Sequence, residues 1–106
     1  MAKYLFMASL SPEGVGGVLD EGGTARRTVV EKAVQTLGGS LEAFYFAFGD
    51  TDVVIICDLP DDETAAAFAM ETSASGRVSV STTVLLTPEQ IDARREKKSG
   101  WRAPGT

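Results

Sequence analysis

Val53-Val54-Ile55-Ile56-Cys57 is an unbroken apolar run that lies between Asp52 and the acidic segment 58–63. A strand with one face in water alternates apolar and polar residues, whereas a continuous run rich in β-branched residues indicates that both faces are covered. Tyr4-Leu5-Phe6-Met7-Ala8 has the same character. The sequence therefore predicts two strands that carry apolar side chains on both faces.

The remaining elements are predicted from periodicity and from capping residues. Further strands are expected at Leu41–Phe48 and Arg77–Leu86, the first apolar strand extends over Lys3–Leu10, and helices are expected after Ser11, Thr24, Asp61 and Thr87. The resulting order is βαββαβ, which in a ferredoxin-like α+β fold forms a four-stranded antiparallel sheet with spatial order 4-1-3-2 and helices on one face. This order places the two apolar strands at the centre of the sheet.

An identical sheet is the simplest partner for the uncovered face. Because the helices cover only one side, the apolar side chains on the other side need a second surface. We therefore expect a homodimer joined through the sheet faces, in the manner of a dimeric α/β barrel.

The charge is unevenly distributed along the 106 residues, which fit one domain. Residues 92–106 contain five Lys or Arg and two Asp or Glu, a net charge of +3. Because the whole chain has a net charge of −5, the rest of the chain carries −8. We expect a domain over residues 1–93 and a basic, flexible tail over residues 94–106. The acidic body argues against nucleic acid as a partner, because phosphates need a basic surface.

Several classes of protein are disfavoured by what the sequence lacks. No window approaches the ~18 apolar residues of a membrane span, and no signal-peptide pattern or second cysteine is present, which favours the cytoplasm. Cys57 is expected to be a buried hydrophobic side chain rather than a nucleophile. The chain has no histidine, so a His-based catalytic site or a His metal site is excluded, and we expect no metal and no cofactor.

The strongest polar candidate for a ligand site is the segment Gly22–Arg27. Glycines allow backbone amides to approach an anion at a helix start, and Arg26 and Arg27 add two guanidinium groups, of which at least one is expected to lean toward the core. The alternative is a helix stop and cap followed by two surface arginines. Tyr45, between two small residues, and Asp52, in the predicted hairpin, are further candidates for ligand binding.

Four stretches of the sequence resemble the GYD domain family. They are Phe44–Ile56, Asp58–Glu63, Glu21–Arg27 and Thr82–Glu89, and the resemblance extends over residues 3–93. It implies a small bacterial or archaeal protein without an established activity. It also implies kinship with dimeric α/β barrels, which include isomerases, cofactor-free oxygenases and dechlorinating enzymes.

The family's Gly-Tyr-Asp signature is only partly present. Gly49 and Asp52 match its ends, while Thr51 stands in the place of the tyrosine.

Three functions are compatible with these residues. The preferred one is a small-molecule-binding or interaction module that takes a small anionic or aromatic ligand. The second is a cofactor-independent enzyme of the isomerase or oxygenase type acting on a small organic acid or aromatic, in which Tyr45 or Asp52 moves protons and Arg26 or Arg27 holds a carboxylate. The third is a scaffold without a ligand.

Overall fold

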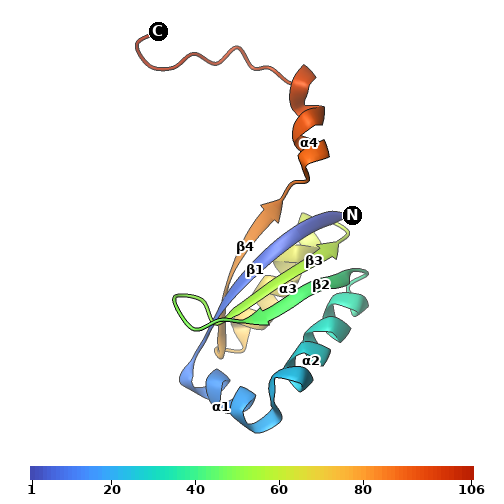
Figure 1. Ribbon diagram of the computed structural model, residues 1–106, viewed down its shortest axis with the longest axis vertical. Coiled ribbons are helices and arrows are strands. Elements are labelled where there is room, and N and C mark those ends of the chain that lie inside the picture. Colours follow the sequence, from blue (N-terminus) through green and yellow to red (C-terminus); the bar gives the residue numbers. More distant parts are fainter.

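The computed structural model describes all residues, 1–106. Its elements are β1 (Ala2–Leu10), α1 (Pro12–Glu21), α2 (Gly23–Thr36), β2 (Ser40–Phe46), β3 (Val53–Leu59), α3 (Asp62–Ala74), β4 (Val78–Leu85), α4 (Pro88–Asp92) and the 3-10 helix η1 (Ala93–Glu96) (Figure 1). All neighbouring strands are antiparallel, and their order is β2-β3-β1-β4. The predicted ferredoxin-like sheet order is confirmed.

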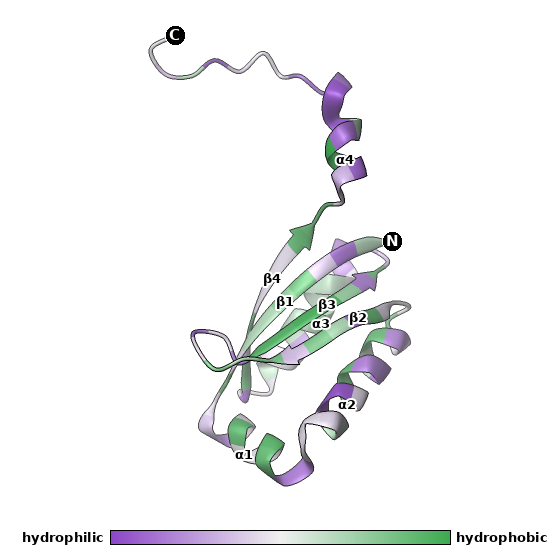
Figure 2. Ribbon diagram, in the orientation of Figure 1, coloured by the Kyte–Doolittle hydropathy of each residue, from purple (hydrophilic) through white to green (hydrophobic).

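One face of the sheet forms the core with the helices. Helix α2 packs against β2 and α3 packs against β4, so both lie on the same side of the sheet. The buried side chains on this side are Tyr4, Phe6 and Ala8 of β1, Val53, Ile55, Cys57 and Leu59 of β3, and Val30, Val34, Ala65 and Phe68 of the two helices. The central strands are accordingly the most hydrophobic part of the sheet in Figure 2.

The other face of the sheet, here called the open face, has no helix over it. Leu5 and Met7 of β1 and Val54 and Ile56 of β3 point to this side, and all four side chains are partly exposed; Met7 is 37% exposed. The prediction of apolar side chains on both faces of the central strands is therefore confirmed. Strand β4 contributes Ser79, Ser81 and Thr83 to the same face, which makes one side of it polar.

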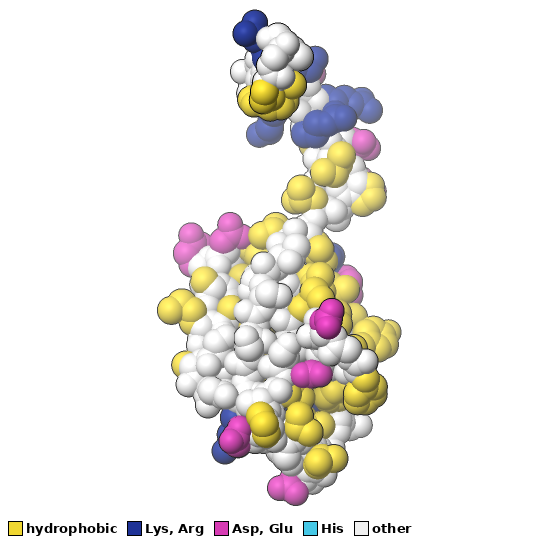
Figure 3. Space-filling model, turned by 90° about the vertical axis from the view of Figure 1, so that its left-hand side faces the viewer, with side chains coloured by type: hydrophobic (Ala, Val, Ile, Leu, Met, Phe, Trp, Pro, Cys, Tyr) yellow, Lys and Arg dark blue, Asp and Glu magenta, His cyan; other side chains and the backbone are white.

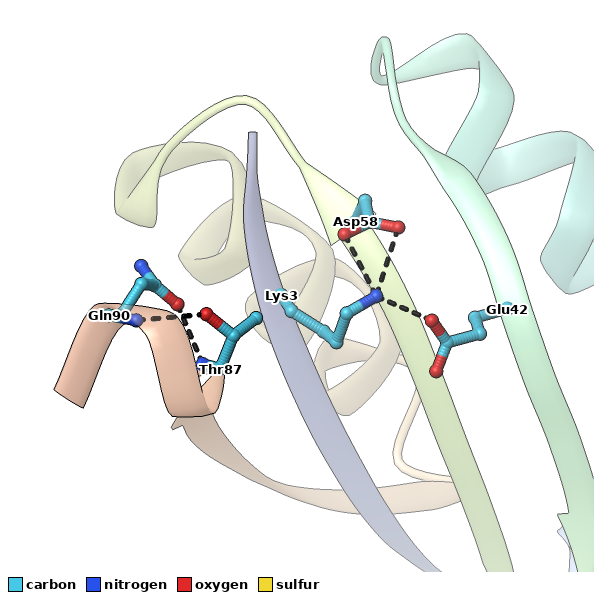
Figure 4. A network of polar contacts seen from close by, with 5 residues as sticks. All are labelled: Lys3, Glu42, Asp58, Thr87 and Gln90. Atoms are coloured by element: carbon cyan, nitrogen blue, oxygen red, sulfur yellow. Dashed lines mark hydrogen bonds and ion pairs between the residues drawn. The ribbon is translucent and has the colours of Figure 1, made fainter. Parts of the chain in front are cut away.

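An ion cluster closes one end of the open face and joins three strands. The Lys3 ammonium of β1 donates to Glu42 Oε1 of β2 at 2.5 Å and to Asp58 Oδ1 of β3 at 3.1 Å (Figure 4). These hydrogen bonds raise the pKa of Lys3, and the bond to Glu42 has a larger effect than the bond to Asp58. The positions of β1, β2 and β3 are thus linked by side chains as well as by the backbone.

Three of the four predicted helix caps are confirmed. The Ser11 hydroxyl accepts from the Gly14 amide, Asp61 accepts from the Thr64 amide at 2.8 Å, and Thr87 forms a capping box with Gln90 (Figure 4).

Thr24 was wrongly predicted to cap the second helix. Helix α2 begins two residues earlier than this cap implies, at Gly23, and its cap position is Gly22, which has no side chain to donate or accept. Gly22 has φ +86°, a left-handed conformation that glycine adopts without strain. The chain therefore turns from α1 into α2 at a single residue, and Thr24 lies inside the helix.

Strand β2 is shorter than predicted. It ends at Phe46 instead of Phe48, because the Ala47 amide donates to the Asp52 carbonyl at 2.8 Å and closes the hairpin. Phe48 lies beyond this closure and is fully exposed.

The C-terminal residues 86–106, here called the C-terminal arm, leave the body of the molecule. Beyond β4 the chain continues in the direction of the strand through α4 and η1 and ends far from the sheet (Figure 1). All residues from Pro88 onward are exposed, and the molecule measures 57 × 33 × 22 Å. None of the helices is long and apolar enough to cross a lipid bilayer.

Candidate functional site

Arg26 is the candidate residue that the fold brings against a cavity. It lies in the first turn of α2, one turn before the buried Val30, so its side chain points toward the sheet side of the helix. Its Nη1 donates to Glu21 Oε1 at 3.2 Å, and 39% of its side chain is exposed. Arg27, the next residue, is exposed and lines none of the main cavities. The expectation that one arginine leans inward is met by Arg26.

A polar opening of about 290 Å³ lies beside Arg26 and is here called the mouth. It is enclosed by α1, by the C-terminal end of α3 and by the start of β4. Two arginines, Arg26 and Arg77, and two carboxylates, Glu13 and Glu21, line it. The mouth therefore offers both signs of charge to a small molecule.

A smaller, apolar cavity of about 60 Å³ lies deeper, between the sheet and the helices. Its wall includes Phe6, Phe68, Phe44 and Val30. The rings of Phe6 and Phe68 pack edge to face, with 5.0 Å between their centroids. Arg26 is the one charged residue in that wall and also lines the mouth. The guanidinium thus lies where the polar opening meets an apolar interior.

Asp52 has a structural position at the end of the sheet. Its Oδ2 accepts from the Leu10 amide at 2.7 Å, and its own amide donates to the Ala8 carbonyl at 2.8 Å. The aspartate that matches the end of the family signature thus fixes the β2–β3 hairpin to β1.

Tyr45 lies on the opposite side of the sheet from Arg26. It is paired with Val54 on the open face and is 69% exposed. The structure therefore brings neither Tyr45 nor Asp52 to the mouth, and no proton-transfer group from the predicted set faces Arg26.

Two titratable groups of the core, Tyr4 and Cys57, have shifted pKa values. The Tyr4 hydroxyl donates to Asp62 Oδ1 at 2.7 Å. This hydrogen bond and, to a smaller extent, burial raise the pKa of Tyr4 to about 12. Burial raises the pKa of the Cys57 thiol to about 11. Cys57 is completely buried, which confirms that it packs as a hydrophobic side chain. No group of three acidic or thiol side chains is close enough to hold a metal ion.

Sequence reasoning missed the other charged residues of the mouth. Arg77 was interpreted only as the start of a strand, and Glu13 was not considered as a site residue. Their proximity depends on the return of β4 past α1, where the Ser11 amide donates to the Arg77 carbonyl at 2.9 Å. No local pattern in either segment signals this long-range contact.

Comparison with known proteins identifies the family. Residues 4–94 match the model of the GYD domain, which is most of the chain and agrees with the resemblance seen in the sequence. Comparison with curated proteins finds no match. From its match to the domain model, the chain belongs to the GYD domain family.

Proposed function

We propose that this protein binds a small amphipathic carboxylic acid, with the carboxylate against Arg26 and the apolar part in the cavity beneath it. The observation that supports this function is the position of Arg26 at the boundary between the polar mouth and the apolar cavity. Sites for small molecules are usually apolar with a few polar groups that fix orientation. The small volume of the inner cavity favours a short aliphatic substituent.

Arg26 has donors to spare for a ligand. A guanidinium carries five N–H donors, and only one contact, to Glu21, engages a carboxylate here. Because both partners of this pair are 39% exposed, the pair is solvent-screened and contributes little to stability. A ligand carboxylate can therefore exchange with Glu21 or occupy the remaining donors at little cost.

Binding is favoured over catalysis by the placement of the proposed acid–base residues. Tyr45 is on the open face, and the Asp52 carboxylate is bonded to the Leu10 amide. Neither residue lines the mouth or the cavity beneath Arg26, so the enzymatic alternative gains no supporting contact from these residues.

We also propose that the protein acts as a homodimer joined through its open faces. The support is the apolar centre formed by Leu5, Met7, Val54 and Ile56, which no element of the chain covers. Burying apolar surface stabilises an interface by roughly 25 cal/mol per Å² before the costs of association are subtracted. The mouth opens on the helix side, so this assembly leaves it accessible.

The ligand proposal is tested by calorimetry with a panel of short aliphatic and aromatic carboxylates and their uncharged amides. Carboxylates should bind and amides should not. Arg26→Ala should weaken binding by roughly 1.5–3 kcal/mol, the range for a hydrogen bond to a charged group. Arg27→Ala is the matched control, since it removes the same charge from the same helix turn outside the cavity. Equal losses in both variants, or binding of amides as tightly as carboxylates, would contradict the proposal.

The dimer proposal is tested by light scattering on the wild type and on two methionine variants. Met7→Glu places a carboxylate at the centre of the open face and should give a monomer. Met70→Glu changes a methionine that is 71% exposed on α3 and should remain dimeric. A monomeric wild type at micromolar concentration, or a Met7→Glu variant that dimerises as tightly as the wild type, would show that the open face is not the interface.

A further inference from the structure

A second apolar depression, here called the cleft, lies between α1 and the β2–β3 hairpin. It has a volume of about 430 Å³ and is lined mainly by Val15, Val18, Leu19, Phe46 and Phe48. Leu19 is 81% exposed and Phe48 is fully exposed. Apolar side chains gathered in this way on a surface usually mark a contact with another molecule.

The C-terminal arm carries the complementary set of unpacked apolar side chains. Leu86, Ile91 and Trp101 are 58%, 47% and 76% exposed. Figure 3 shows hydrophobic side chains on the arm and at several places on the body, including its lower end. The chain therefore has an unfilled apolar cleft at one end and unburied apolar side chains at the other.

The charges on the two ends are also complementary. The arm holds Arg94, Arg95, Lys97, Lys98 and Arg102. Beside the cleft, Asp20 follows Leu19 and Asp50 lies two residues after Phe48, and both are exposed; Asp52 lines the cleft itself. Figure 3 shows the basic side chains gathered mainly on the arm and the acidic ones mainly on the body. This distribution favours a contact between the arm and an acidic surface of the same protein over a contact with nucleic acid.

The arm of a given chain points away from that chain's own cleft. Lys3 pairs with Leu85 at one end of the sheet, while Leu10 and Asp52 line the cleft at the other end. At about 3.3 Å per residue the two ends of β1 are roughly 25 Å apart. The capping box of Thr87 and Gln90 fixes the chain in an outward course immediately after β4.

We propose that the C-terminal arm docks in the cleft of a second copy of this chain, and that two copies exchange arms reciprocally. Trp101 fills the apolar cleft, and the basic residues 94–98 face the acidic residues beside it. A two-fold axis makes both contacts equivalent, so the exchange closes at a dimer and leaves no arm free.

The test uses the only tryptophan of the chain, Trp101, as its own reporter. As the protein concentration is raised through dimer formation, Trp101 emission should shift to the blue and its quenching by acrylamide should fall several-fold. The double variant Leu19→Lys, Phe48→Ser should abolish this change; both residues are so exposed that folding is not expected to suffer. Met70→Ser, at an exposed apolar position on α3, is the control and should behave as the wild type.

A mixing experiment separates exchange between chains from folding back within one chain. Trp101→Ala protein has an intact cleft and no tryptophan fluorescence. Added to the Leu19→Lys, Phe48→Ser protein, it should restore the blue shift, because it supplies the missing cleft in trans. Three results would overturn the proposal: a fully quenchable Trp101 in the dimer, a shift that does not depend on concentration, or growth to masses beyond a dimer. None of these results decides whether a carboxylate binds at Arg26, so the two proposals fail separately.

Discussion

Replacing Gly14 by alanine should destabilise the protein, although it replaces a poor helix former by the best one. Helix α1 contains three glycines, at positions 14, 16 and 17. In a helix interior each costs about 0.8–1.0 kcal/mol relative to alanine. On propensity alone, every Gly→Ala substitution in α1 should therefore stabilise the fold.

The surroundings of Gly14 reverse this expectation. A Cβ at Gly14 would lie 2.4 Å from the carbonyl oxygen of Arg77, which is backbone and cannot rotate away. The same carbonyl accepts the Ser11 amide at 2.9 Å, so moving it breaks the bond that holds the start of α1 to β4. Overpacking of this kind costs about 1–3 kcal/mol and a lost hydrogen bond about 0.5–1.5 kcal/mol. Their sum exceeds the propensity gain, so Gly14→Ala should lower stability by about 1–3 kcal/mol.

Gly16→Ala is the matched control, because a Cβ at Gly16 meets no atom within 4 Å. It should raise stability by up to about 1 kcal/mol, which places the two variants about 1–4 kcal/mol apart. The measurement is urea unfolding followed by circular dichroism, at one fixed protein concentration because association adds to stability. If Gly14→Ala is as stable as Gly16→Ala, α1 does not approach β4 as closely as described, and the mouth that it encloses is wider.

Two further predictions concern the hydrogen bonds around α3. Tyr4→Phe removes the hydrogen bond to Asp62 and should lower the stability by about 1 kcal/mol at neutral pH. Because the pKa of about 12 in the folded protein lies above the ordinary value of 10.0, the wild type alone loses this part of its stability as the pH rises from 10 toward 12. The stability difference between the two proteins, measured by denaturation at alkaline pH, should therefore narrow over that range. Asp61→Ala should lower the melting temperature at neutral pH. Hydrogen bonds from the Thr64 hydroxyl and amide lower the pKa of Asp61. The difference in melting temperature between wild type and variant should therefore be complete above about pH 4 and disappear as the pH falls through this lowered pKa. If the stability difference between the wild type and either variant did not change with pH, the corresponding hydrogen bond would not be the source of the pH dependence.

The sheet could be predicted from the sequence because its signal is local. An apolar run such as 53–57 needs cover on both faces wherever it lies, and the ferredoxin-like strand order places two such runs side by side at the centre. The helix caps were predictable for the same reason, since Ser11, Asp61 and Thr87 each bond within three residues of themselves. The prediction of a cap at Thr24 was wrong because the chain already turns at Gly22. The capping propensity of threonine takes no account of such a turn two residues earlier.

The candidate site was only half predictable. Helical spacing from Val30 indicated that one arginine of the pair faces inward, and the structure selects Arg26. The pattern did not reveal that Glu13 and Arg77 share the mouth, because their contact depends on how β4 returns past α1. It also gave no sign that Asp52 is engaged by the Leu10 amide, a bond that spans 42 residues along the chain.

The two proposed contacts share one structural element, which predicts that they are coupled. Val18 of α1 and Leu10 of β1 line both the mouth and the cleft, so α1 is the wall between the ligand and the arm of the second copy. An arm in the cleft restrains α1, and a ligand at Arg26 restrains it from the other side. Coupling of binding free energies is reciprocal, so dimer formation should strengthen ligand binding by the same factor by which ligand strengthens the dimer.

This coupling is measured by titrating ligand below and above the concentration at which dimers form. The wild type should bind more tightly as a dimer. The Leu19→Lys, Phe48→Ser variant should bind with one affinity at all concentrations, because its cleft cannot hold the arm. Equal affinities for the wild type in both states would show that α1 is already rigid in the single chain. The contact of Gly14 with β4 and the turn at Gly22 would then be sufficient to hold it, and the arm would serve assembly alone.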